Sequence, residues 1–161
     1  MINDETLREA VVNYDDSIEN YKAILYVCLE GGAGDIMAAD NMTTGTSWLA
    51  GAAIGGAIGG AIGGMSNDWA IMTINHDYLC FYVLDKFKMS LVITGKFIIT
   101  YEAIKKMRIT RFLVWTNLKI HFTDGNERHK LKVKASSKCV GIKRQRENVN
   151  ILVDYLRSKN L

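Results

Sequence analysis

The chain from residue 69 to residue 134 is a succession of short strand patterns, and this feature constrains the fold more than any other. Residues 69–75 and 78–84 flank a two-residue connection, His76-Asp77, and this arrangement predicts a β-hairpin. Later segments alternate apolar and polar side chains, and Asp124-Gly125 predicts a tight turn between two of them. These further strands are expected at residues 91–93, 96–100, 105–114, 117–122 and 127–134.

Helical patterns lie near both ends of the chain. Residues 4–14 have apolar side chains at helical spacing and predict a short helix with Asp4 as its cap. Residues 21–30 predict the first strand, which is apolar on both faces and is therefore expected to be covered on both faces. Residues 141–158 predict an amphipathic helix whose apolar stripe consists of Ile142, Val149, Leu152, Val153 and Leu156.

The order of these elements predicts a mainly β fold with α-helices, in the α+β class. About seven antiparallel strands followed by one amphipathic helix are typical of a small barrel or sandwich whose open end is plugged by that helix. A chain of 161 residues suits one domain, residues 1–161. Within it we expect a helix and linker at residues 1–19 and an insert at residues 42–66, in the connection between the first and second strands.

Two short phrases resemble parts of a known superfold. Residues 74–79 (INHDYL) look like its second-to-third strand hairpin, and residues 99–104 (ITYEAI) are similar to its polar link before the mid-domain strand. With the turn at Asp124-Gly125 and the terminal helix, residues 20–30 and 68–158 resemble the pleckstrin-homology-like superfold in its bacterial, GRAM-like branch. The resemblance implies a binding module rather than an enzyme.

The same resemblance implies where a lipid headgroup would bind. Eukaryotic members of the superfold often hold phosphoinositides with basic residues around the first-to-second strand loop. Here the chain between Tyr21 and Trp69 contains one base, Lys22, so that basic signature is missing. A glycine repeat stands in its place.

This insert, residues 42–66, is free of charge and contains the unit Ala-Ile-Gly-Gly three times, from Ala53 to Gly64. On a helix, small residues four apart allow close backbone approach, as in helix pairs within lipid. Each glycine costs roughly 1 kcal/mol of helix propensity relative to alanine, so such a helix needs a partner surface. The partner could be a membrane, another copy, a partner protein or the body of the domain, and the alternative is a flexible Gly/Ala loop. The expected contact residues are Gly51, Gly55, Gly59 and Gly63, with Ile54, Ile58 and Ile62.

Charge is distributed unevenly along the chain. Residues 1–40 hold nine acids and two bases, whereas residues 41–161 hold 18 bases and eight acids. If the late strands pair as expected, their polar positions share one sheet face, which either binds an anionic surface or is simply solvated. The residues expected to bind such a surface are Lys106, Arg108, Lys119, Arg128, Lys130 and Lys132. Nucleic acid is not expected, since the chain shows no recognition helix and its tryptophans do not interleave with the bases.

No catalytic motif is present in the sequence. The three histidines lack metal-ligand spacing, the cysteines form no C-x-x-C pair, and no phosphate loop or nucleophile elbow occurs, so we expect no enzyme activity, metal or cofactor. The first residues are acidic where a secretory signal would be basic, which favours a cytoplasmic location, with peripheral or partial membrane insertion left open.

Two functions fit these observations. The first is a non-enzymatic, pleckstrin-homology-like binding module whose glycine-zipper helix mediates membrane association or self-assembly. The second is a soluble protein-binding adaptor or immunity-type protein that pairs with a glycine-zipper partner, such as a pore-forming toxin.

Overall fold

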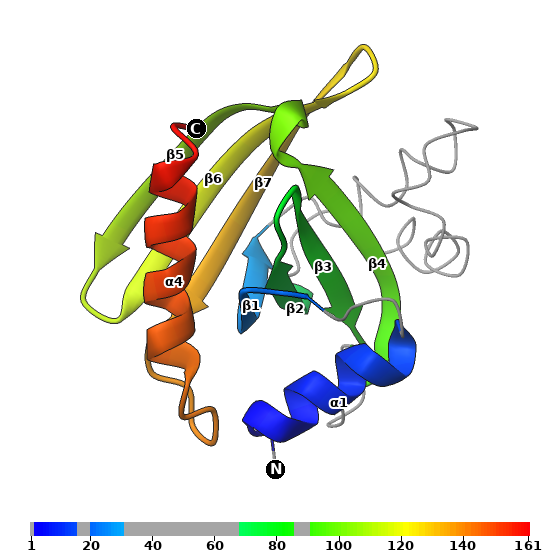
Figure 1. The fold of residues 1–161 in the computed structure, drawn as a ribbon, viewed down its shortest axis with the longest axis vertical. Helices are drawn as coiled ribbons and strands as arrows, with labels where there is room; N and C mark the ends of the chain where they lie inside the picture. Colours follow the sequence, from blue (N-terminus) through cyan, green and yellow to red (C-terminus); the bar gives the residue numbers. More distant parts are fainter. Residues whose placement is uncertain (1, 16–19, 31–67, 86–90) are drawn as a thin grey trace.

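The computed structural model describes residues 2–15, 20–30, 68–85 and 91–161, and Figure 1 shows how their elements are arranged. Two α-helices and seven strands make up most of this part of the chain. In chain order the elements are α1 (Asp4–Tyr14), β1 (Ala23–Glu30), β2 (Asp68–Ile74), β3 (Tyr78–Leu84), β4 (Ile93–Thr100), the 3₁₀ turn η3 (Tyr101–Ala103), β5 (Ile104–Phe112), β6 (Trp115–Asp124), β7 (Glu127–Ser136) and α4 (Gln145–Ser158).

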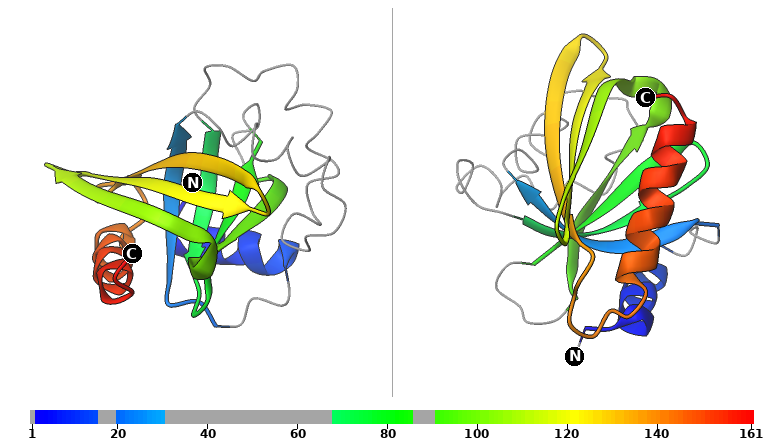
Figure 2. Two further views of the ribbon diagram at one scale, coloured as in Figure 1. Left: turned by 90° about the horizontal axis from the view of Figure 1, so that it is seen from above. Right: turned by 90° about the vertical axis from the view of Figure 1, so that its left-hand side faces the viewer.

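The seven strands form one antiparallel sheet with the order β4-β3-β2-β1-β7-β6-β5. β1 pairs with β2 along most of its length but pairs with β7 only over Val27–Glu30. The sheet therefore bends at this junction, and Figure 2 shows β5–β7 crossing β1–β3 at a steep angle. The expected mainly β architecture with about seven antiparallel strands and a C-terminal helix is confirmed. The sheet is open, with β4 and β5 as its edges, so the described strands do not close into a hydrogen-bonded barrel.

The main core lies inside the bend of the sheet. Alternate side chains of all seven strands point into it, among them Leu25, Phe81 and Phe97, and all three are fully buried. The helix α4 covers the open side with Val149, Leu152 and Leu156, which belong to the same cluster. Burying a side chain of this size contributes about 1.5–3 kcal/mol, so the amphipathic stripe holds the helix in place. The predicted stripe positions 149, 152, 153 and 156 are all buried.

The predicted start of this helix was wrong by several residues. The helix begins at Gln145, because Gly141 adopts a positive φ of 90° and Cys139 forms an isolated β-bridge with Ile142. Ile142 is buried, as expected for the stripe, but it packs in a second cluster on the other face of the sheet.

That second cluster covers the outer face of β1–β4. Leu7 and Val11 of α1 pack there against Ile24, Ile71 and Tyr82. The first strand is thus buried on both faces, which confirms the prediction from its sequence. The predicted cap of α1 was wrong by one residue: Asn3 accepts a hydrogen bond from the backbone N–H of Thr6 at 2.9 Å, and the Thr6 hydroxyl accepts one from the backbone N–H of Asn3.

Polar contacts fix α4 against β1 where β1 has left β7. The side chain of Gln145 accepts a hydrogen bond from the Tyr26 N–H at 3.1 Å and donates one to the Tyr26 carbonyl at 2.7 Å. Asn148 donates to the Ile24 carbonyl at 2.8 Å. These two side chains replace the strand partner that β1 lacks there, so buried backbone groups stay paired.

Two further predictions concern the bounds of β4 and the glycine-rich insert. The segment expected at 96–100 lies within β4, whereas of the segment expected at 91–93 only Ile93 belongs to that strand. The pairing of β3 with β4 has a register shift between Val83 and Leu84. The glycine-zipper insert, residues 42–66, lies outside the described residues, and so do its contact positions. Among the described residues no helix is long and apolar enough to cross a membrane.

Candidate functional site

The outer surface of β5–β7 carries a concentration of positive charge. On β6 and β7 the residues Leu118, Ile120, Leu131 and Val133 point into the core, so the positions between them face outward. Neither α1 nor α4 covers this surface, since α1 packs on β1–β4 and α4 packs inside the bend. We call it the basic face, and its members, all exposed, are Lys106, Arg108, Lys119, Arg128, Lys130 and Lys132.

Strand pairing places these side chains in rows across three strands. Arg108 lies opposite Lys119, and Lys119 lies opposite Lys132. A second row joins Lys106 to His121 and His121 to Lys130, and Arg128 lies opposite Thr123. The six residues selected from the sequence do share one face, because side chains alternate along each strand and the β6–β7 turn sets the register. The two turn residues are Gly125 and Asn126, one position later than expected, since Asp124 pairs with Glu127.

Repulsion between the like charges of the basic face destabilises the folded protein when no anion is bound. The charge of Lys130 in the first place, then slight desolvation and the charges of Lys132 and Arg108, lower the pKa of Lys119. Like charges directly opposite each other on a sheet destabilise it. Beside the basic face, the carboxylate of Glu30 at the end of β1 lies 3.6 Å from the ammonium of Lys134, which is not one of its members.

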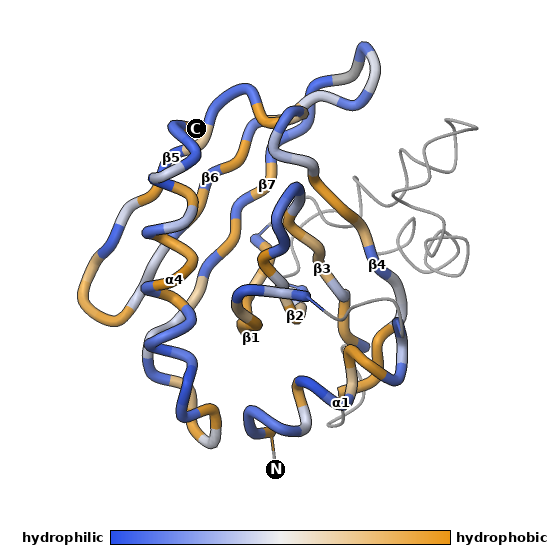
Figure 3. Tube along the Cα trace, viewed as in Figure 1, coloured by the Kyte–Doolittle hydropathy of each residue, from blue (hydrophilic) through white to orange (hydrophobic). Residues whose placement is uncertain are grey.

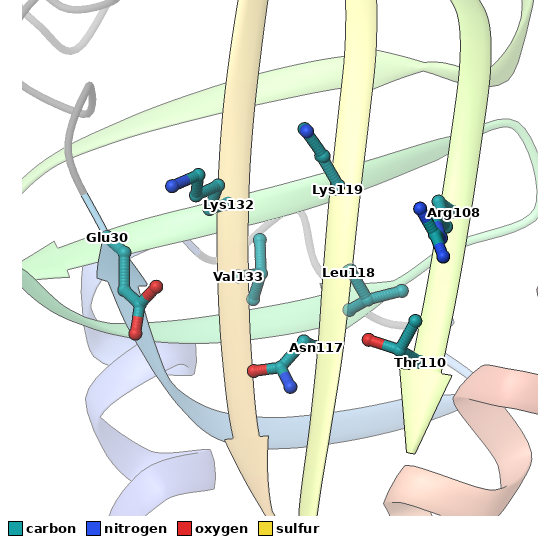
Figure 4. Close-up of a pocket in the computed structure, with 8 residues that line it drawn as sticks. All are labelled: Glu30, Arg108, Thr110, Asn117, Leu118, Lys119, Lys132 and Val133. Carbon is teal, nitrogen blue, oxygen red and sulfur yellow. The ribbon is translucent and has the colours of Figure 1, made fainter. Parts of the chain in front are cut away.

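A shallow hollow of about 220 Å³ lies in the basic face. Figure 4 shows Arg108, Lys119 and Lys132 projecting from three neighbouring strands at one end of it, with Glu30 at the side and Asn117 and Thr110 at the other end. Ammonium and guanidinium donors with neutral amide and hydroxyl groups suit an anion such as a phosphate group. Leu118 and Val133 complete the lining.

The structure also brings together aromatic residues that the sequence analysis did not connect. Trp69 of β2 stacks on Tyr26 of β1 with ring centroids 5.0 Å apart, and the Lys134 ammonium lies 4.8 Å from the ring centre of Trp115. These four residues line a groove of about 320 Å³ next to the basic face. In the folded chain Trp115 therefore contacts a base that lies on a neighbouring strand. These contacts could not be predicted from local sequence patterns, because they depend on the strand order, which places β2, β1, β7 and β6 side by side.

Asp15 and Cys80 are buried titratable groups that lie outside the basic face. Lys96 and Tyr82 both donate to the carboxylate of Asp15 at the end of α1, and this buried cluster attaches the helix to the sheet. Burial raises the pKa of the Cys80 thiol to about 11, which keeps it un-ionised and a poor nucleophile near neutral pH. No group of three or more His, Cys, Asp or Glu side chains within the described ranges is arranged to hold a metal ion.

Comparison with protein-family models, with curated proteins and with solved structures gives no match for this chain. The function must therefore be argued from the residues of the site.

Proposed function

We propose that this protein is a non-enzymatic, pleckstrin-homology-like binding module that docks on an anionic lipid surface through its basic face. The glycine-rich insert then contributes membrane association or self-assembly. The observation that carries the proposal is the cross-strand row Arg108–Lys119–Lys132, in which three cations lie opposite one another on an exposed sheet face.

The physical argument is that this arrangement destabilises the free protein and is relieved by an anion. The lowered pKa of Lys119 reflects repulsion from Lys130, Lys132 and Arg108. A layer of anionic headgroups supplies compensating charge to all the rows at once, and the exposed outer surface of β5–β7 can face such a layer. The hollow beside Lys119 offers room for one phosphate group.

The architecture supports the same class of function. A bent antiparallel sheet of seven strands with one C-terminal helix inside the bend agrees with the fold that the pleckstrin-homology-like resemblance implies. The basic face differs from the headgroup site of that family, because it lies on strands β5–β7 and not around the first-to-second strand loop.

The test is co-sedimentation of the full chain with vesicles of equal parts phosphatidylcholine and phosphatidylserine, with phosphatidylcholine vesicles in parallel. We expect the double variant Lys119→Glu/Lys132→Glu to bind the anionic vesicles about tenfold or more weakly than the wild type at low salt. The difference should shrink at high salt, because the Debye length falls from about 10 Å at about 0.1 M salt to about 3 Å at about 1 M salt.

The matched control reverses two exposed charges elsewhere, in Arg8→Glu/Arg146→Glu. Arg8 lies on α1 and Arg146 on α4, so neither belongs to the basic face. If both double variants bind equally well, or equally badly, the binding depends on net charge and the basic face is not the docking surface.

The second candidate function, a soluble adaptor or immunity-type protein, is favoured by the regularity of the Ala-Ile-Gly-Gly repeat, which could pair with a similar helix of a partner. It predicts that the wild type binds neither kind of vesicle and forms a stoichiometric complex with a protein instead.

A further inference from the structure

The hairpin between β5 and β6 ends in apolar side chains that the protein leaves exposed. Phe112 is 70% exposed and Leu113 is 87% exposed. Val140 belongs to the loop after β7 and is 94% exposed, and this loop is attached to the hairpin by a hydrogen bond of 2.7 Å from the Ser137 N–H to the Val114 carbonyl. We call Phe112, Leu113 and Val140 the apolar tip, and Figure 3 shows the hydrophobic colour of the β5–β6 turn.

Leu113 is unfavourable for two reasons: its apolar side chain is exposed, and its backbone adopts a strained conformation. The turn contains two residues, Leu113 and Val114, because Phe112 pairs directly with Trp115. Leu113 has a φ of +54°, a value at which glycine is unstrained and a side chain meets the backbone. A glycine here would remove both costs. A large apolar residue at such a position points to a contact outside the chain.

The surroundings of the apolar tip indicate what this contact is. Along β5, the outward positions run from Phe112 through Thr110 to Arg108, so the tip continues directly into the basic face. Trp115 lies beside it with the Lys134 ammonium above its ring. Tryptophan and lysine next to a protruding apolar turn are typical of proteins that bind at the boundary between lipid headgroups and acyl chains.

We propose that the apolar tip inserts into the interfacial layer of an anionic bilayer and so orients the basic face on the lipid surface. This inference rests on the proposed function and adds the depth and direction of docking. Charge complementarity favours lipid over a second copy of the chain, because a second copy would bring another basic face toward the first.

The test uses the full chain with Leu113→Gly and the same phosphatidylcholine/phosphatidylserine vesicles. Since glycine relieves the positive φ, the variant should unfold at the same or a higher urea concentration than the wild type. Its partition to vesicles should weaken about tenfold, through loss of one buried leucine side chain. Phe112→Ser should act in the same direction without changing the turn. Val12→Ser, on the exposed side of α1, is the matched control and should bind like the wild type.

A second readout reports insertion itself. Brominated lipid should quench the fluorescence of the wild type more strongly than that of Trp115→Phe, because Trp115 would lie at the depth of the tip. Wild-type binding by both tip variants, with loss of binding by Lys119→Glu/Lys132→Glu, would overturn the insertion and leave surface docking intact. Wild-type binding by all three would overturn both proposals. If Leu113→Gly instead dissociates a homo-oligomer in analytical ultracentrifugation without weakening vesicle binding, the tip is a protein interface and the insertion is wrong.

Discussion

Gln145 is the residue through which α4 is fixed to the sheet. Its side chain is fully buried and makes two hydrogen bonds to the backbone of Tyr26, at 3.1 Å and 2.7 Å. Without them, an N–H and a carbonyl of β1 would lie in the interior with no partner. Leaving such a buried group unpaired costs about 1–3 kcal/mol.

We therefore predict that Gln145→Leu lowers the free energy of unfolding by about 3 kcal/mol, measured by urea denaturation followed by circular dichroism. Leucine has similar volume, so the loss reports the two hydrogen bonds more than a cavity. The control is Arg146→Ala at the neighbouring exposed position, which should change stability by less than about 0.5 kcal/mol. An equal effect of the two substitutions would show that Gln145 does not hold the helix in place.

The sequence could not have identified this residue. In the helical pattern of residues 145–158, Gln145 and Asn148 read as members of the polar side. Their partners, Tyr26 and Ile24, are 119 and 124 residues away along the chain. Hydrophobic periodicity indicates which side of a helix is apolar. It does not indicate that a polar side chain is buried against the backbone of a strand far away in the sequence.

At the scale of single elements, the charge of Lys119 on β6 favours the proposed binding of an anionic surface but lowers the stability of the free protein. Lys119 lies between Arg108 and Lys132, and the repulsion from Lys130, Lys132 and Arg108 contributes to its lowered pKa. We predict that Lys119→Thr raises the urea midpoint of unfolding, because it removes like-charge contacts and introduces a residue that favours strands. The gain should be largest at low salt, and Lys105→Thr, at a position skipped by the β5–β6 register, should show little salt dependence.

The direction of the pKa shift of Lys119 also predicts how the stability difference between the wild type and Lys119→Thr changes with pH. The pKa of Lys119 is lower in the folded state than in the unfolded state, so the unfolded chain binds more protons between those two values. Wild-type stability therefore gains a contribution as the pH rises through this window, and Lys119→Thr lacks it. The advantage of the variant should diminish in alkaline solution, and an advantage that grows there would contradict this account.

Several elements could be predicted because their signals are local. The His76-Asp77 connection and the Asp124-Gly125 pair predicted two hairpins that the structure contains, the second with its turn one residue later, at Gly125 and Asn126. The alternation of side chains along each strand placed the charged positions of β6 and β7 on one face. Other features depend on strand order, which no local pattern encodes. The aromatic groove joins Tyr26, Trp69 and Trp115 from three strands that are distant in sequence, and the apolar tip arises from a turn whose strain shows only in its φ.

At the scale of the whole molecule, part of the acidic N-terminal segment is used inside the described fold. The Asp4 carboxylate accepts hydrogen bonds from the backbone N–H groups of Lys143 and Arg144 at 2.9 Å and 3.2 Å, and Asp15 accepts one from Lys96. These contacts lie away from β5–β7, so they leave the basic face available. Two of the N-terminal acids are thus held away from the basic face, and the separation of acids and bases along the chain is kept on the folded surface.

The glycine-rich insert can be separated from the fold by one replacement, in which a short Gly/Ser linker takes the place of residues 46–66. We predict that the urea midpoint stays close to that of the wild type. β1 and β2 pair from Ala23 opposite Ile74 to Leu29 opposite Asp68, and the entropy of closing the connection changes only slowly with its length.

Vesicle binding should then divide into two components. Binding through the basic face falls with salt, whereas insertion of an uncharged glycine-zipper helix does not. If the full chain sediments at high salt and the linker variant does not, the insert associates with the membrane, and Gly59→Leu should abolish that component by blocking close helix approach. If both sediment only at low salt, the basic face alone binds lipid and the insert has another partner. If neither sediments, the membrane function is wrong, and a protein that pairs with the Ala-Ile-Gly-Gly repeat becomes the partner to identify.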